Sequence, residues 1–210
     1  RIIDHELPRL TRGAPPPPKV PTERSAAAPV PATPDEISRQ FAVLQRHLDE
    51  LRRPESANQI SALLMRAARE FFERAVLFLV KHDEARGLGG FGSAPRDQKI
   101  GLVVREVTVP LQEPSLFRDI VTAGKAYAGA LPDGRWEQYV LGKIGRFKSN
   151  TVALIPLLAH RETIAVLFGD NPETGREFGR LDALEVLVSQ AGIAFENVFL
   201  QRKLEELQKR

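Results

Sequence analysis

The feature that most restricts the fold is a pair of apolar segments in the second half of the chain. Thr151–Leu158 and Thr163–Gly169 are rich in aliphatic residues, and only the short turn Ala159–Glu162 separates them. This pattern predicts a β-hairpin. A further apolar run, Ala75–Val80 (AVLFLV), is too short for a helix of its own and predicts a buried strand. The apolar faces of such strands must be buried. We therefore expect helices elsewhere in the chain to pack on the sheet that these strands form.

Helices are predicted before the first strand and after the hairpin. Thr33–Glu36 and Ser56–Gln59 are capping boxes, in which an N-cap hydroxyl stands three residues before a glutamate or glutamine, and they mark helix starts. Pro54 ends the first of these two helices. The last helix is expected to start near Phe178 and to continue to the C-terminus.

The first and last helices both carry apolar residues at alternating spacings of three and four, which is typical of coiled coils. Residues 34–54 are therefore expected to form a coiled-coil-like helix, and helices from two copies of the chain to pair as a homodimer in a parallel bundle. Three leucines near the C-terminus, Leu200, Leu204 and Leu207, continue the last helix on a shifted stripe. The predicted dimer interface consists of Ile37, Phe41, Leu44, Leu48 and Leu51 in the first helix, with Leu181, Val188, Phe195 and Val198 in the last.

The segment between the first strand and the hairpin is less regular. Gly87–Gly92 (GLGGFG) lacks the spacing and the lysine of a phosphate-binding loop and predicts a flexible turn instead. His82–Glu84 predicts another turn. The remaining predicted elements are a strand at Glu106–Leu111, a short helix at Ser115–Thr122, a short strand at Lys125–Ala128 and a helix capped by Asp133.

Prolines gather at the start of the chain, where nine of the sixteen lie within the first 34 residues. Alanines fill much of the remainder of this stretch and large apolar residues are scarce, so residues 1–33 are predicted to be a disordered, proline-rich linker. Because the chain starts at Arg1 without a methionine, we expect an upstream domain of the same chain before the linker. Residues 55–210 are then the domain proper.

Composition excludes several classes of site. Without cysteine the chain cannot form disulfides, iron–sulfur clusters or thiolate zinc sites, and it has no metal-ligand spacing. Carboxylates at strand ends, among them Asp83, Asp170 and Glu173, are interpreted as turn formers rather than as an acid–base pair, so an enzyme is not expected. The net charge is only +3 and the basic residues are spread out, so nucleic-acid binding is not expected either.

Segments that direct a protein into or across a membrane are not expected. The sequence does not open with the pattern of a signal peptide, and no run approaches the roughly 18 consecutive apolar residues of a membrane-spanning helix. A cytoplasmic protein that carries no cofactor and contacts no membrane is expected.

The order of predicted elements and several of their sequences resemble the GAF domain, a sensory and regulatory module of bacterial signalling proteins. Thr151–Pro172, followed by Phe178 and Asp182, resembles the closing hairpin and last helix of the family. Ser115–Lys125 resembles its central short helix, and Arg74–Val80 its first strand. The resemblance covers about residues 56–204. It implies an α+β fold: a six-stranded antiparallel sheet with the N- and C-terminal helices on one face and a pocket under short helices on the other.

The resemblance also implies a function, that of a non-catalytic module which relays a ligand or partner signal. Cyclic-nucleotide-binding members of the family carry a glutamate where this chain has Ala183, and phytochrome members attach a bilin through cysteine, so neither ligand is expected. Two alternatives remain: a sensor of a nucleotide or aromatic metabolite, and a protein-interaction adaptor with an empty or filled-in pocket. The candidate ligand-binding residues are Phe117, Tyr127, Trp136, Tyr139 and Phe147.

Overall fold

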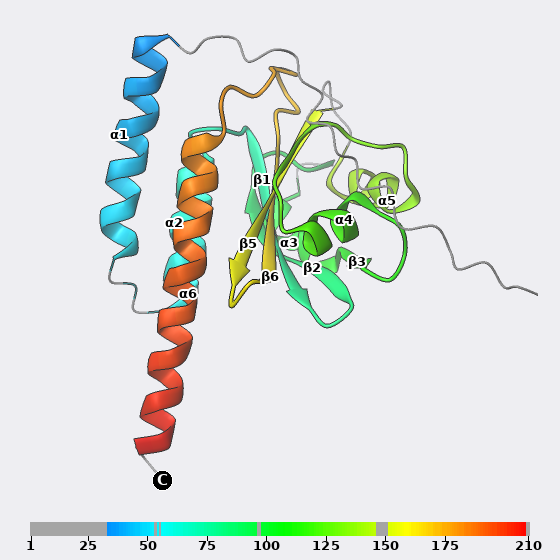
Figure 1. Cartoon of the computed structure of the whole chain (residues 1–210). Coiled ribbons are helices and arrows are strands. Elements are labelled where there is room, and N and C mark those ends of the chain that lie inside the picture. The colour runs from blue at the N-terminus through cyan, green and yellow to red at the C-terminus, as the bar shows by residue number, and fades with distance from the viewer. Residues whose placement is uncertain (1–32, 53, 55, 96–97, 146–150, 209–210) are drawn as a thin grey trace, which may run out of the picture.

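The computed structural model describes residues 33–208 except 53, 55, 96–97 and 146–150. These residues form a six-stranded antiparallel sheet with helices on both faces (Figure 1). The strands lie in the order β3-β2-β1-β6-β5-β4. The predicted α+β fold with flanking terminal helices is therefore confirmed. The predicted linker, apart from Thr33, lies outside the described residues.

The middle of the sheet consists of the most apolar strands. β1 and β6 pair with Arg74 opposite Asp170. β5 and β6 form the predicted hairpin, and its turn residues His160 and Arg161 adopt positive φ angles of 51° and 66°. The six strands are β1 (Arg74–Lys81), β2 (Glu84–Phe91), β3 (Thr108–Pro110), β4 (Tyr127–Ala130), β5 (Thr151–Ala159) and β6 (Glu162–Asp170).

The glycine-rich segment is a strand, and the flexible turn predicted for it is wrong. It forms most of β2, which pairs with β1 from Glu84 to Phe91. A Cβ atom on Gly87 would overlap the carbonyl group of Val104, and one on Gly90 would crowd the carbonyl oxygen of Ala75. The glycines therefore allow neighbouring backbone to approach the strand closely. Val104 begins the 3-10 helix η2 (Val104–Glu106), which directly follows the short helix α3 (Ile100–Val103).

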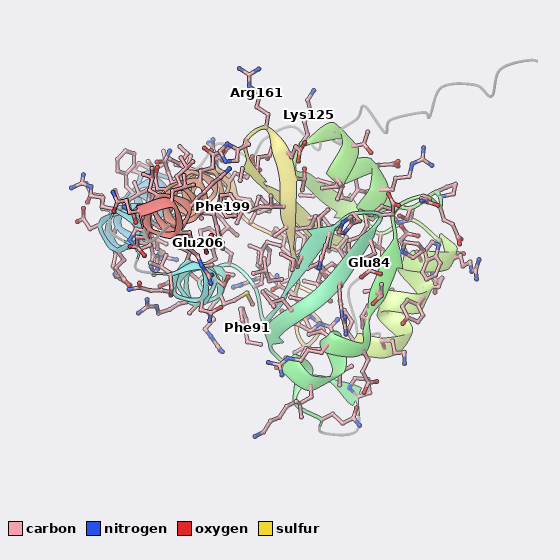
Figure 2. The ribbon with its side chains drawn as sticks, turned by 90° about the horizontal axis from the view of Figure 1, so that it is seen from below. Glu84, Phe91, Lys125, Arg161, Phe199 and Glu206 are labelled. Carbon is pink, nitrogen blue, oxygen red and sulfur yellow. The ribbon has the colours of Figure 1, made fainter. Side chains whose placement is uncertain are left out.

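Three helices lie on one side of the sheet: α2 (Ala57–Ala68) and α6 (Asp182–Gln208) pack on the strands, and α1 (Pro34–Leu51) packs on these two helices from outside. Figure 2, a view from below, shows them grouped to one side of the strands. As predicted, the Ser56 hydroxyl caps α2 by accepting a hydrogen bond of 3.2 Å from the Gln59 amide. The helices and the sheet share a hydrophobic core that includes Leu51, Leu64, Leu157, Leu167, Leu184 and Leu187.

The long helix α6 lies against the sheet with its first half and extends beyond it with its second (Figure 1). Close packing is possible because Gly192 has no side chain, and a Cβ atom there would overlap the carbonyl oxygen of Leu158 in β5. α6 begins at Asp182 rather than near Phe178, whose ring packs edge-on against Phe72 at 5.3 Å. By length and composition α6 could cross a membrane, but its first half is built into the core as in a globular domain.

The other face of the sheet carries α3, α4 (Leu116–Ala123) and α5 (Arg135–Ile144). The helix predicted at Ser115–Thr122 is confirmed as α4. The Ser115 hydroxyl caps its start, and Gly124 ends it in the left-handed region with a φ of 60°. The N-cap of α5 is Gly134 rather than the predicted Asp133. The Asp133 carboxylate instead accepts a hydrogen bond from the side chain of Gln138.

Candidate functional site

A second hydrophobic core occupies the space between the sheet and the short helices, where the resemblance implies a pocket. Phe117 from α4 is fully buried there, and its ring packs edge-on against Phe78 of β1 with ring centroids 4.9 Å apart. Aromatic pairs in this arrangement stabilise a core beyond the area that they bury. The surrounding buried residues are Val76, Val104, Ile120, Val140, Ile144, Leu154 and Phe168.

A buried carboxylate also belongs to this core. Glu137 in α5 accepts a hydrogen bond of 2.5 Å from the backbone amide of Leu116, the first residue of α4. Its second oxygen, Oε2, has no hydrogen-bond partner among the described residues. The amides at a helix start favour a negative charge. The Glu137 side chain therefore already occupies the start of α4, where a group of an external ligand could otherwise bind.

Two of the candidate ligand residues pair on the outer side of α5. The rings of Trp136 and Tyr139 are half-buried and nearly perpendicular, with centroids 5.5 Å apart. The Trp136 indole donates a hydrogen bond of 2.9 Å to the Glu113 carboxylate, which also pairs with Arg135 at 3.1 Å. The indole N–H of Trp136 and the guanidinium group of Arg135 thus already have a partner within the chain, the Glu113 carboxylate.

The other candidates lie elsewhere. Tyr127 is half-buried on the edge strand β4, where its hydroxyl donates to the Ala130 carbonyl oxygen at 2.5 Å. Phe147 lies outside the described residues. The structure therefore pairs Trp136 with Tyr139, buries Phe117 in the core, and packs Tyr127 against the same core from β4.

The predicted interface residues divide into three groups. Leu51, Leu181 and Val188 are buried in the core of the chain's own helical face. Leu44, Leu48, Phe195 and Val198 are half-buried against the same core. Ile37 and Phe41 are exposed, with 49% and 60% of their surface accessible. The regular spacing on which the interface prediction was based thus belongs mostly to the face of each helix that packs inside the chain.

A separate apolar stripe points outward from α6. It contains Val186, Ile193, Leu200 and Leu207, which are spaced by seven residues and are all exposed. Near the start of α6, Val186 and the exposed α1 residues Ile37 and Phe41 line one groove of about 300 Å³. We call the six residues Ile37, Phe41, Val186, Ile193, Leu200 and Leu207 the outer stripe.

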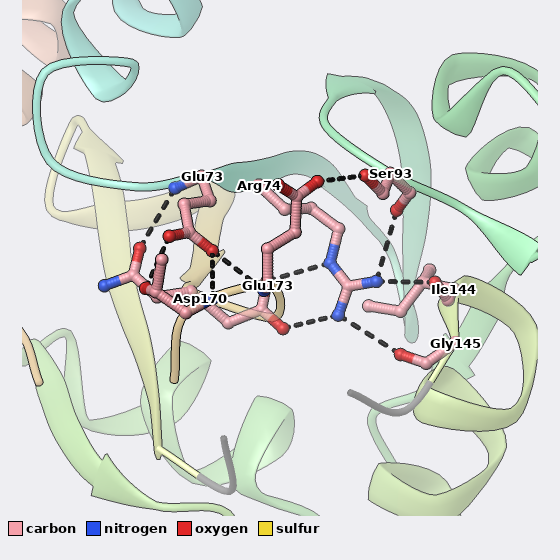
Figure 3. A network of polar contacts seen from close by, with 9 residues as sticks. Glu73, Arg74, Ser93, Ile144, Gly145, Asp170 and Glu173 are labelled. Atoms are coloured by element: carbon pink, nitrogen blue, oxygen red, sulfur yellow. Dashed lines mark hydrogen bonds and ion pairs between the residues drawn. The ribbon is translucent and has the colours of Figure 1, made fainter. Parts of the chain in front are cut away.

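The described residues also contain a buried polar network at one edge of the sheet, where it joins the start of β1 to the end of β6 (Figure 3). Arg74 is fully buried, and its guanidinium group pairs with the Asp170 carboxylate through two hydrogen bonds, the Nε bond measuring 2.8 Å. Burial raises the pKa of Asp170, and the hydrogen bonds and charge of Arg74 oppose that rise. Asp170 is therefore a buried ion-pair partner, and its interpretation as a turn former is wrong.

Sequence reasoning missed this pair although one signal for it was present. Arg74 directly precedes the apolar run of β1, and Asp170 directly follows that of β6. Opposite charges at these positions face each other only if the two strands are antiparallel neighbours in this register. That pairing joins residues 96 positions apart, so local pattern alone could not reveal it.

Comparisons with known proteins complete the description. No family model matches the sequence, and no curated protein does. Among solved structures, the GAF domain of a phosphoenolpyruvate-protein phosphotransferase from Coxiella burnetii aligns with a TM-score of 0.56 at 13% identity, covering 81% of this chain and 98% of that one. The GAF domain of a sensor histidine kinase from Bacillus halodurans gives 0.50 at 18% identity, covering 70% and 99%.

A third similar structure is the phycocyanobilin-bound GAF domain of a cyanobacterial phytochrome, with a TM-score of 0.56 at 16% identity over 77% of this chain and 96% of that one. At such identities the likeness concerns the fold alone. Within the described residues, no three His, Asp or Glu side chains are grouped as metal ligands would be. The sheet order, the two helical faces and these structural matches agree, and the chain folds as a GAF domain.

Proposed function

We propose that the chain is a non-catalytic regulatory module of a bacterial signalling protein, and that it dimerises through α1 and α6. The observation that carries the proposal is the outer stripe. Six large apolar side chains on two adjacent helices lie exposed in the single chain, and four of them repeat every seven residues along α6. Coiled-coil helices that pair side by side carry two apolar positions in each seven residues, and the α6 stripe supplies one of them.

The proposed partner is a second copy of the chain. A twofold arrangement would place the stripe of one α6 against that of the other, with α1 alongside each, as in a four-helix bundle. This proposal replaces most of the interface predicted from sequence, because Leu51, Leu181 and Val188 are occupied in the core. Ile37 and Phe41 remain part of it.

The dimer would pass a signal along its helices. α1 follows residues 1–33, the expected linker to an upstream domain. The second half of α6 extends beyond the sheet (Figure 1), and this half would carry the signal to an output. Structures with the same fold come from a sensor histidine kinase and a methyl-accepting chemotaxis protein. These origins support a signalling role for this chain as well.

The filled core favours an adaptor over a small-molecule sensor as the form of this module. Phe117 and Phe78 fill the space beneath α4, and the Glu137 carboxylate already binds the start of that helix. A ligand in this place would have to displace both groups. A partner protein that contacts α5 from outside would not have to displace either group.

Native mass spectrometry of the purified chain tests both parts of the proposal. We expect a dimer mass with no retained small molecule. The double variant Phe41→Lys/Ile193→Lys should be monomeric at concentrations where the wild-type chain is dimeric, because lysines at the centre of the stripe would place like charges together in the interface.

The matched control is Leu102→Lys, which changes an equally exposed leucine of α3 on the opposite face. This variant should remain dimeric. A monomeric wild-type chain, or a double variant that still dimerises, would refute the proposed interface. A retained small molecule would favour the sensor.

A further inference from the structure

We propose that Arg74 and Asp170 form a conformational latch that couples the end of α5, on one face of the sheet, to the β6–α6 connection, which leads to the helices on the other face. The Arg74 side chain is fully buried at the start of β1, opposite Asp170 at the end of β6. A buried charge of this kind needs all its hydrogen-bond partners.

Those partners come from several segments. Besides the two bonds to Asp170, the guanidinium group donates to the carbonyl oxygen of Ile144 at 2.5 Å, to that of Gly145 at 3.2 Å and to that of Ser93 at 3.4 Å (Figure 3). Ile144 is the last residue of α5, and Gly145 is its C-cap. A positive charge at the end of a helix satisfies carbonyl groups that the helix leaves unpaired. The end of α5 is therefore held by a side chain of the central strand.

The next residues along the same two strands hold the β6–α6 connection. The Glu73 carboxylate accepts hydrogen bonds from the Glu173 amide at 2.8 Å and from the Thr174 hydroxyl at 2.5 Å. The Asn171 side chain accepts from the Glu73 amide at 3.0 Å and donates to the Arg176 carbonyl at 2.9 Å. Residues 73–74 and 170–171 thus fix α5 and the connection at the same time.

Ser93 joins the two parts of the network directly. Its carbonyl oxygen accepts from Arg74, and its hydroxyl donates to the Glu173 carboxylate. The continuous set of bonds runs from Ile144 through Arg74 to Glu173 (Figure 3). Further along the connection, the ring of Phe178 packs against that of Phe72, and the chain then enters α6.

Such a network responds in discrete steps. Arg74 uses all five of its N–H groups, so a shift of the α5 end removes acceptors that nothing else in the described network replaces. A buried charge that loses partners is strongly unfavourable, so the remaining bonds rearrange together. A partner or ligand that moves α5 would in this way change the β6–α6 connection and the packing of α6. Its signalling consequence rests on the proposed function, but the coupling itself lies within one chain.

The test is a mutational cycle read by amide hydrogen exchange. Gly145 has a φ of 92°, so Gly145→Ala strains the backbone and loosens the end of α5. In the chain with Arg74 and Asp170 intact, we expect this substitution to raise the exchange rates of residues 171–181 by about fivefold or more, a typical strength of allosteric coupling. In the Arg74→Met/Asp170→Leu background, Gly145→Ala should leave those rates unchanged.

The control variant is Gly142→Ala, in the same helix, where an added Cβ meets no neighbouring atom within 4 Å. It should not change exchange in residues 171–181. Amides of β5 report global opening, and an equal rise there would count against a latch. If the double substitution does not fold, Arg74→Lys takes its place, because three donors cannot serve all five contacts.

The proposal is overturned if Gly145→Ala leaves residues 171–181 unchanged, or if it raises their exchange by the same factor in both backgrounds. Because exchange reports on contacts within one chain, it can be measured in the monomeric Phe41→Lys/Ile193→Lys variant too. Failure of the latch would then leave the dimer proposal standing, and failure of the dimer would leave the latch standing.

Discussion

At the scale of single residues, His47 is an unusual member of the contact between α1 and the rest of the chain. It is only 3% exposed, and neither ring nitrogen has a hydrogen-bond partner among the described residues. The Glu50 carboxylate lies 3.8 Å from Nδ1. Arg66, which pairs with Glu50 at 2.6 Å, and the Arg46–Glu70 pair are the other charges that act on it.

The environment of His47 makes stability depend on pH. Burial lowers its pKa below the ordinary value of 6.5, and the attraction of Glu50 only partly opposes this. The neutral ring is thus favoured in the folded chain, and its contribution to stability is fully present above pH 6.5. As the pH falls below that value, the unfolded chain binds the proton more readily, and stability is lost. We expect the free energy of unfolding to fall between pH 7.5 and pH 5, and to fall less in His47→Leu.

Urea unfolding at several pH values measures this difference. His82→Asn is the matched control, because His82 is exposed in the β1–β2 turn and asparagine tolerates its positive φ of 53°. The control should keep the wild-type pH dependence. If His47→Leu keeps it as well, His47 is not the group responsible.

At the scale of elements, the contact between α6 and β5 depends on Gly192. An alanine there would force its Cβ atom into the carbonyl oxygen of Leu158, and backbone cannot move aside as a side chain can. We therefore expect Gly192→Ala to destabilise the chain by about 1–3 kcal/mol, the usual cost of overpacking a core. Gly142→Ala, in the exposed part of α5, should instead be neutral or stabilising by up to about 1 kcal/mol through helix propensity. Urea unfolding of both variants measures these changes. Equal free energies of unfolding in the two variants would contradict the prediction.

Elements that depend on local sequence could be predicted, and those that depend on distant contacts could not. The hairpin, β1 and the caps at Ser56 and Ser115 follow from residues adjacent in the chain. β2 was missed because glycine is needed there to let the backbone of Val104 approach, and Val104 comes later in the sequence. The candidate ligand residues were chosen by type, and type does not distinguish the buried Phe117 from the half-exposed Trp136.

The same distinction explains the interface prediction. A spacing of three and four identifies an apolar face but not what covers it. In α6 two apolar faces exist: one includes Val188 and packs inward, and the other includes Ile193, repeats only every seven residues and lies exposed. Only the position of α6 against the sheet assigns each face its role.

At the scale of the whole molecule, one sheet separates two hydrophobic cores that differ in how they end. The core beneath α4 and α5 is closed by those helices, whereas the helical core ends partway along α6. From Phe199 to Gln208 every residue of α6 is exposed, leucines included. This last part of the helix contributes little to the fold of one chain, and the outer stripe continues along it.

Removing residues 200–210 should therefore separate pairing from folding. We expect the free energy of unfolding of the monomer to change by less than about 0.5 kcal/mol, as for other exposed positions. The dissociation constant of the dimer should rise at least about tenfold, because Leu200 and Leu207 lose the burial that pairing gives them. Sedimentation equilibrium measures the dissociation constant, and urea unfolding at low protein concentration measures the free energy of unfolding.

A chain that lacks only residues 209–210 is the control and should pair as the full chain does. An unchanged dissociation constant in the longer truncation would confine the interface to the part of the outer stripe before Leu200, and a destabilised monomer would mean that the end of α6 packs on its own chain.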